Sequence, residues 1–310
     1  MAPLEVVPFG EEHLDAAGRL LAERQARHRA AEPLLADEDP RAAVEAAWRE
    51  PGAVGVVALR SGGPEAYLIA VLEGADPVFG NPAWVSRQGH AASDPEILRD
   101  LYAAAAEPWL EAGADRHYVL VPALERDLDT WYRLGFGHMH VEGIRESGAD
   151  PRPLPGGVTI RRGDLDDLED AIAIDRLIYS VQERSPSFQG SPDPERWRSA
   201  WIETLEDPEV AYFVAETRGR IVGHTTMHPR PEFGTPSDSV YLASTVTSEE
   251  VRGTGVGVAL AEHALRWARE NGYGSVNTGW RMTNLLASRF WPARGFRPFF
   301  HRLHRAIGLG

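Results

Sequence analysis

Three glycines follow an arginine in the stretch 249–272, which reads EEVRGTGVGVALAEHALRWARENG. Arg252 precedes Gly253, Gly255 and Gly257, and a run with helical apolar spacing comes next. Backbone N–H groups at the start of a helix lack intrahelical partners and lie at the positive end of the helix dipole. Glycines carry no Cβ, so an anion can approach such amides closely. The stretch predicts either a cradle for a phosphate group or a flexible turn before an amphipathic helix.

Spacing and composition exclude two other phosphate loops. A dinucleotide-binding fingerprint needs a glycine where Val258 stands. A Walker loop needs a lysine, and the chain has none, because all 32 basic residues are arginine. The same absence excludes a lysine that forms a Schiff base with pyridoxal phosphate.

The glycine stretch needs a strand before it and a helix behind it, and the second half of the sequence supplies both. We expect a strand over 238–247 and a helix from about Gly255. Further strands are expected at 158–162, 211–217, 221–229, 273–280 and 296–306, the second and third of these forming a hairpin, and helices at 164–181, 193–207 and 283–294.

The first half shows a similar series of elements. AVGVVALR and EAYLIAVLEG predict a hairpin, followed by a helix near 94–113, a strand near 116–123 and a helix end at WYRLGF. WYRLGF (131–136) and WPARGF (291–296) lie 160 residues apart. We interpret this as an internal duplication of one α/β unit, with coincidence between two ordinary helix-to-strand turns as the alternative. A proline- and glycine-rich stretch at 145–157 predicts the boundary near residue 150.

Composition narrows the classes of function. The chain has 310 residues, a net charge of −14 and no cysteine. Thiol nucleophiles, zinc–thiolate sites and disulfides are excluded, and a reducing cytoplasm fits. No apolar run approaches a membrane span, the start does not resemble a secretory signal, and the acidic balance argues against a nucleic-acid partner. We expect no metal, and a monomer or homodimer.

Two motifs together resemble the GNAT acetyltransferase superfamily. Its motif A, Q/R-x-x-G-x-G/A, matches Arg252, Gly255 and Gly257 after a strand and before a helix. A second family element matches NLLASRFWPARGF, from Asn284 to Phe296. The resemblance covers 158 to about 306 strongly and the first half more weakly. It implies an α/β fold, with a mixed α+β sheet flanked by helices, in two tandem GNAT-like domains: 1–150, degenerate and without the pyrophosphate loop, and 151–310, with an acetyl-CoA site.

The resemblance also implies a reaction and a cofactor site. The expected function is an N-acetyltransferase that moves the acetyl group of acetyl-CoA directly to a small-molecule amine. The strand end before motif A would hold the thioester and pantetheine, and the glycine loop the pyrophosphate. The implied acetyl-CoA residues are Thr245, Val246, Thr247, Arg252, Gly253, Thr254, Gly255, Val256, Gly257, Asn284 and Trp291. Asn284 is equally well explained as a helix cap.

The sequence gives weaker evidence for the groups that transfer protons. The family often has a tyrosine where Trp291 stands, and that phenol commonly protonates the departing thiolate; an indole does not readily do so. Tyr241 is our first substitute for this acid. His224 and His228 share one face of a predicted strand and are candidate bases, with packing or surface roles as the alternative. Glu216 is a weaker candidate.

Three further expectations concern the acceptor, the first half and turnover. Tyr179, Glu183 and Phe188 lie in a segment where the family places its acceptor site, although an ordinary helix and loop is the alternative. In the first half, Asp94 stands at the expected anion site, so that domain is expected not to bind CoA. Since the acid is missing, a weak or inactive acyl-CoA-binding or regulatory module remains an alternative to the enzyme.

Overall fold

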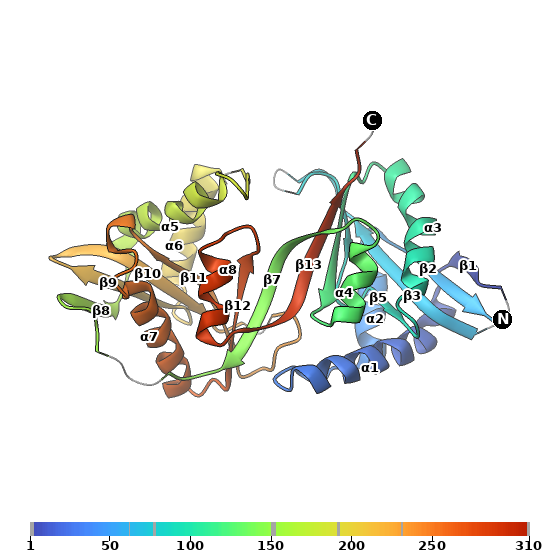
Figure 1. Cartoon of the computed structure of the whole chain (residues 1–310), viewed down its shortest axis with the longest axis horizontal. Coiled ribbons are helices and arrows are strands. Elements are labelled where there is room, and N and C mark those ends of the chain that lie inside the picture. Colours follow the sequence, from blue (N-terminus) through green and yellow to red (C-terminus); the bar gives the residue numbers. More distant parts are fainter. Residues whose placement is uncertain are drawn as a thin grey trace. The chain divides into compact units, whose positions relative to one another are not determined.

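The computed structural model describes residues 3–61, 63–76, 79–149, 153–190, 193–230 and 232–308. The chain forms two compact units, one of Met1–Val141 with Pro298–Gly310 and one of Glu142–Arg297 (Figure 1). The boundary expected near residue 150 falls on 150–152, which lie outside the described residues. The expected domains assign all of 151–310 to the second unit, whereas the last 13 residues group with the first. No helix in the described part of the chain is long and apolar enough to cross a bilayer.

The first unit is built on the strand order β1-β2-β3-β4-β6-β13. Its strands are β1 (Glu5–Pro8), β2 (Ala53–Arg60), β3 (Gly63–Leu72), β4 (Pro82–Val85), β5 (His90–Ala92, paired with β3), β6 (Arg116–Pro122), the start of β7 (Gly137–Glu146) and β13 (Arg297–Ala306). Its helices are α1 (Leu14–Ala31), α2 (Pro40–Arg49), α3 (Ile97–Glu111) and α4 (Glu125–Tyr132). The predicted hairpin is confirmed, because β2 and β3 pair antiparallel.

The second unit contains the glycine stretch and is built on the order β8-β9-β10-β11-β12 with the end of β7. Its strands are β8 (Val158–Arg162), β9 (Ala211–Thr217), β10 (Arg220–His228), β11 (Ser239–Thr247) and β12 (Ser275–Arg281). Its helices are α5 (Leu168–Gln182), α6 (Pro194–Glu206), α7 (Val256–Glu270) and the short α8 (Ala287–Phe290). The expected strands and the hairpin β9–β10 are confirmed.

Adjacent residues of β10 show how the helices cover this sheet. A Cβ at Gly223 would lie 3.1 Å from Leu260 Cδ1 on α7. The neighbouring His224 contacts Asp175 on α5 and Trp201 on α6. Because successive side chains of a strand point to opposite faces, α7 covers one face and α5 with α6 the other.

One expected helix is much shorter than its pattern suggested. Instead of one helix over 283–294, α8 is followed by a 3-10 turn, Pro292–Arg294. Pro292 cannot donate a backbone hydrogen bond, and Gly295 ends the turn with φ +82°. The twin motif in the first unit ends the same way at Gly135, with φ +81°.

The two tryptophan motifs also form corresponding backbone hydrogen bonds. Phe136 N–H donates to the carbonyl of Trp131 at 3.2 Å, and Phe296 N–H to that of Trp291 at 3.3 Å. Helices α3 and α7 also end in the same way. The N–H of Ala114 donates to the carbonyl of Trp109, and the N–H of Tyr273 donates to the carbonyl of Ala268. This agreement in local geometry supports the duplication.

Candidate functional site

Strands β11 and β12 separate at the point where the site begins. They pair in parallel only over Ser239–Leu242 and Ser275–Thr278, although β11 continues to Thr247 and β12 to Arg281. Ala243 is an extra residue on β11, because Thr226 of β10 pairs with Ser244 while Met227 pairs with Leu242. A bulge of this kind bends a strand and re-aims its side chains. Beyond Leu242, the end of β11 therefore keeps one edge without a strand partner among the described residues.

The glycine loop connects β11 to α7 and needs its glycines. Gly253 has φ +76° and Gly255 φ +96°, a region in which residues with a Cβ are strained. Gly255 is the N-cap residue of α7 and has no side chain to accept from the first amides of that helix. These N–H groups are therefore available to a ligand.

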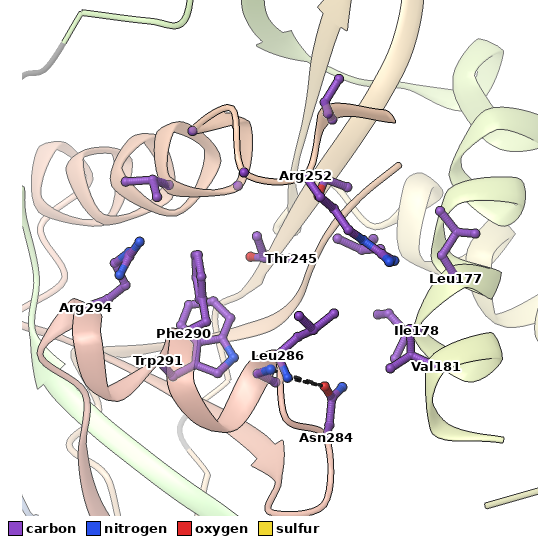
Figure 2. Close-up of a pocket in the computed structure, with 18 residues that line it drawn as sticks. Leu177, Ile178, Val181, Thr245, Arg252, Asn284, Leu286, Phe290, Trp291 and Arg294 are labelled. Atoms are coloured by element: carbon purple, nitrogen blue, oxygen red, sulfur yellow. Dashed lines mark hydrogen bonds between the residues drawn. The ribbon is translucent and has the colours of Figure 1, made fainter. Parts of the chain in front are cut away.

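A cavity of about 480 Å³ lies between these elements (Figure 2). One wall is Leu177, Ile178 and Val181 of α5, and another is the segment from Asn284 to Arg294. The end of β11 and the glycine loop complete it. Among its described lining residues, the charged ones are two arginines and none is a carboxylate. The cavity is therefore not an acidic pocket, although the chain as a whole has a net charge of −14.

Most of the residues predicted for the cofactor line this one cavity. They are Thr245, Val246, Thr247, Arg252, Gly253, Gly255, Gly257, Asn284 and Trp291. Thr254 and Val256 are not among its lining residues. The hydroxyl of Thr254 donates to the carbonyl of Val251 at 2.7 Å, and the side chain of Val256 is buried in the core. Only their backbone can take part.

Two predicted ligands already have partners within the chain. Arg252 forms an ion pair with Glu249 at 3.1 Å, and both side chains are partly open to solvent. Such a surface pair is weak, so a ligand anion can replace the carboxylate. Asn284 Oδ1 accepts from the N–H groups of Leu286 at 3.1 Å and Ala287 at 3.2 Å. The capping alternative for Asn284 is therefore realised, while the residue still lines the cavity.

Thr245 presents only hydrogen-bond acceptors to the cavity. The hydroxyl of Thr225 donates its single hydrogen to the carbonyl of Ser244 at 2.8 Å. It also lies 2.8 Å from Thr245 Oγ1, so in that second bond Thr245 is the donor. The hydrogen of Thr245 is then used, and its lone pairs are left for an N–H group of a ligand.

The three candidates for proton transfer are not among the residues that line the cavity. His224 is fully buried, and its Nε2 lies 3.3 Å from Asp175 Oδ1. This placement does not suit a base that must receive a proton from a substrate. His228 and Tyr241 are cross-strand partners and are half-buried. Burial, reinforced by nearby Arg230, lowers the pKa of His228, so it is neutral and able to accept a proton at pH 7.

Trp291 packs tightly where the family commonly has its tyrosine. It is 6 % exposed, and its ring meets those of Phe290 and Phe296 edge-on, with centroids 4.9 and 5.2 Å away. The indole thus forms an apolar wall of the cavity. An indole N–H is a donor only and is not acidic enough to protonate a thiolate readily.

The expected acceptor residues are not among the residues that line the cavity, and two of them adjoin at the end of α5, where Glu183 N–H donates to the carbonyl of Tyr179 at 2.7 Å. Tyr179 packs against Trp197, and burial raises the pKa of its phenol to about 12. Glu183 is at the end of α5, and Phe188 is 74 % exposed. Ser187 donates to Thr283 Oγ1 at 2.8 Å, which ties this loop to the segment before Asn284. The weaker candidate Glu216 is held in an ion pair with Arg161.

The sequence reasoning missed several lining residues. Leu177, Ile178 and Val181 have helical spacing that could have marked an apolar wall, but nothing in the sequence shows that the wall faces the glycine loop. Phe290 and Arg294 lay inside a recognised motif. The positive charge of Arg294 was the available signal.

The first unit differs at the matching helix. Asp94 Oδ1 accepts from the N–H of Glu96 at 3.2 Å, just before α3, and also pairs with Arg126 at 2.8 Å. The hydrogen bond from the Glu96 amide has the largest effect in lowering the pKa of Asp94, and the bond from Arg126 adds to it, so the carboxylate stays charged. A carboxylate of the chain itself therefore sits at the amide end of α3.

Comparisons with known proteins agree with this arrangement. The model of the Acetyltransferase (GNAT) family matches residues 177–296. A GCN5-related N-acetyltransferase from Sphaerobacter thermophilus superposes with a TM-score of 0.61 at 18 % identity, over 100 % of this chain and 98 % of the other. A tandem GNAT protein from the clavulanic acid biosynthesis pathway gives 0.51 at 16 % identity, over 99 % and 100 %.

A third similar structure extends beyond this chain. It is the GCN5-related glucosamine N-acetyltransferase region of a fungal multi-domain β-N-acetylglucosaminidase, with a TM-score of 0.57 and 15 % identity over 98 % of this chain and 38 % of the other. No curated protein matches the sequence. Residues 177–296 therefore match the model of the GNAT acetyltransferase family, and the chain as a whole has the fold of the tandem GNAT protein.

Proposed function

We propose that the unit Glu142–Arg297 is an acetyl-CoA-dependent N-acetyltransferase that acts on a small-molecule amine. One observation supports this most strongly. The edge of β11 that has no strand partner among the described residues and the uncapped amides of α7 line the same cavity, and two arginines also line it. A ligand that is extended and amide-bearing at one end and carries a diphosphate at the other fits all three features.

Each part of the site then has a role. The amides at Gly255–Gly257 and the guanidinium of Arg252 bind the diphosphate. The edge of β11 at Thr245–Thr247 pairs with the pantetheine arm as an added strand would. A backbone N–H of that edge donates to the thioester oxygen as negative charge develops on it.

The chemistry is direct acyl transfer in a ternary complex. The amine nitrogen forms a bond to the carbonyl carbon, the carbon–sulfur bond breaks, and sulfur leaves as a thiolate. The amine gives up one proton and the thiolate gains one. We assign these transfers to His228, as base, and Tyr241, as acid; the two are half-buried cross-strand partners on β10 and β11, and neither is among the residues that line the cavity. His224 is not assigned a role in these transfers, because its ring is fully buried.

The first unit is proposed as a scaffold that does not bind CoA. Asp94 satisfies an amide ahead of α3 and would repel a diphosphate there. By contrast, the start of α7 has no side-chain cap. One CoA per chain is the expected stoichiometry.

A second function, an acyl-CoA-binding module without efficient turnover, is favoured by one observation. Trp291 is buried in the wall where a phenol would serve as acid. The two functions differ in free thiol released when the protein is mixed with acetyl-CoA and a panel of amines. Release with any amine supports the enzyme, and binding by calorimetry without release supports the module. If acetyl-CoA does not bind at all, both proposals fail.

A further inference from the structure

Arg294 is held at a fixed place on the cavity wall. It ends the 3-10 turn after Trp291, and its carbonyl accepts from the guanidinium of Arg145. Gly295 follows in the left-handed region, at φ +82°, and its N–H bonds to Pro292 at 3.0 Å. Hydrogen bonds at Arg294 and at the residue after it thus fix the position of this backbone.

The charge of Arg294 is not neutralised within the described chain. Its guanidinium carbon lies 4.4 Å from the centroid of the Phe290 ring, which orients the group by a cation–π contact. Its Nε is buried and has no hydrogen-bond partner. No carboxylate among the described residues forms an ion pair with it. A buried donor of a charged group without a partner is costly, which points to an anionic ligand.

Arg294 is separated from the glycine loop by Phe290. A Cβ at Gly257 would lie 3.8 Å from Phe290 Cε2, while the guanidinium of Arg294 stacks on the ring. Figure 2 shows Arg294 and Arg252 on opposite sides of Phe290. An anion bound by the loop amides and Arg252 therefore leaves Arg294 free for a second anion.

Arg294 also lines a second cavity. This cavity of about 350 Å³ has Arg294 in its wall, together with Arg145, Leu265 and Ala293. The buried Glu262 also lines this second cavity. Because the first cavity has no carboxylate among its described lining residues, a phosphate at Arg294 is favoured on the side of that first cavity.

We propose that Arg294 binds the 3′-phosphate of coenzyme A, so that the site discriminates CoA from 3′-dephospho-CoA. This inference rests on the proposed function. The diphosphate belongs to the loop, and the phosphate monoester on the ribose is the second anion of the same ligand. Guanidinium and phosphate oxygens form paired, charge-assisted hydrogen bonds. The preorganised side chain of Arg294 can form them without losing another partner.

The test compares two ligands on two proteins by calorimetry with the full-length chain. We expect the wild type to bind CoA roughly 10- to 100-fold more tightly than dephospho-CoA, as hydrogen bonds to a charged group imply. In Arg294→Gln, the affinity for CoA falls to about that for dephospho-CoA, whose own affinity changes little. Arg294→Lys should retain part of the preference.

Arg289 provides the matched control. It is exposed on α8, five residues earlier, and is not among the residues that line either cavity. Arg289→Gln should keep the full preference for CoA. Circular dichroism and thermal unfolding establish that each variant is folded.

The outcomes separate this inference from the function on which it rests. If neither ligand binds the wild type, the proposed function fails. If the wild type binds both ligands equally, the assignment of Arg294 is wrong although the CoA site stands. If Arg294→Gln weakens both ligands by the same factor, Arg294 contacts the diphosphate and the inference is overturned.

Discussion

Gly257 allows the phosphate cradle to be tested without disturbing the fold. It is the second residue of α7 and lines the cavity. A Cβ there would lie 3.7 Å from Thr247 Cγ2 and 3.8 Å from Phe290 Cε2, which is ordinary contact. Its φ is not in the left-handed region, whereas Gly255 has φ +96°. A side chain at 257 is therefore tolerated, and one at 255 is strained.

Gly257→Asp should affect stability and binding in opposite directions. A carboxylate in the first turn interacts favourably with the helix dipole, by about 0.3–1 kcal/mol, and losing glycine from a helix adds up to about 1 kcal/mol. The same carboxylate faces the bound diphosphate. At a separation of ~6 Å and an effective dielectric constant of ~20, one pair of like charges costs about 3 kcal/mol, or roughly 100-fold in affinity.

Gly257→Asn has nearly the same shape without the charge and is the matched control. Calorimetry with acetyl-CoA should show roughly 100-fold weaker binding for the aspartate than for the asparagine variant, and this gap should narrow as salt is added. Urea unfolding should show both variants at least as stable as the wild type. Equal affinities for the two variants would refute the assignment of the diphosphate to this loop.

Three other predictions concern single groups of the molecule. Trp291→Tyr should turn over at least about ten-fold faster than Trp291→Phe in single-turnover assays, since a phenol at this position adds an acid that phenylalanine does not provide; equal rates would mean that protonation of the thiolate does not limit turnover. Thr245→Val should weaken acetyl-CoA binding by roughly ten-fold, and Thr245→Ser should restore it, because only the hydroxyl accepts an N–H; a serine variant as weak as valine would contradict this. Burial lowers the pKa of His28 and His138 to about 4, and of His90 and His301 to about 3. As the pH falls, these histidines therefore bind protons in the unfolded chain before they do so in the folded chain. The free energy of unfolding keeps its full value above pH ~6.5 and decreases below it by up to about 1.4 kcal/mol per pH unit for each histidine. Urea midpoints that do not change between pH 7.5 and 5.0 would oppose this.

The local elements of the second half were predictable because their patterns are strong. The apolar spacing after Gly255 and the break at Asn271–Gly272 give α7 within a residue or two. The alternation in AYFVAET and IVGHTTMHP gives the hairpin β9–β10. Where the pattern failed, at 283–294, Pro292 and the contacts of Asn284 with Leu286 and Ala287 divide the helix.

The end of β11 and the glycine loop of the candidate site were predictable, because they share a short stretch of chain. The proximity of Asn284 and Trp291 to that loop followed only from the resemblance to a known family. The opposite wall, at Leu177, Ile178 and Val181, comes from a helix about 75 residues earlier and depends on how α5 packs. The grouping of Pro298–Gly310 with the first unit is likewise a long-range pairing, of β13 with β6.

The burial of His224 could not be foreseen for a related reason. Alternation along β10 predicts that His224 and His228 share one face. It does not show that α5 and α6 cover one of them completely, with Asp175 as its partner, and leave the other half-open. Which side chains of a strand are buried depends on helices from elsewhere in the chain.

Hydrogen exchange with and without acetyl-CoA tests the central claim most directly, because it reports which amides the ligand covers. We expect added acetyl-CoA to slow exchange at Thr245–Thr247 and at Gly255–Val258, and to leave the start of α3 near Asp94 unchanged. Binding that protects the start of α3, or that leaves the β11 edge and the glycine loop exchanging as before, would contradict it.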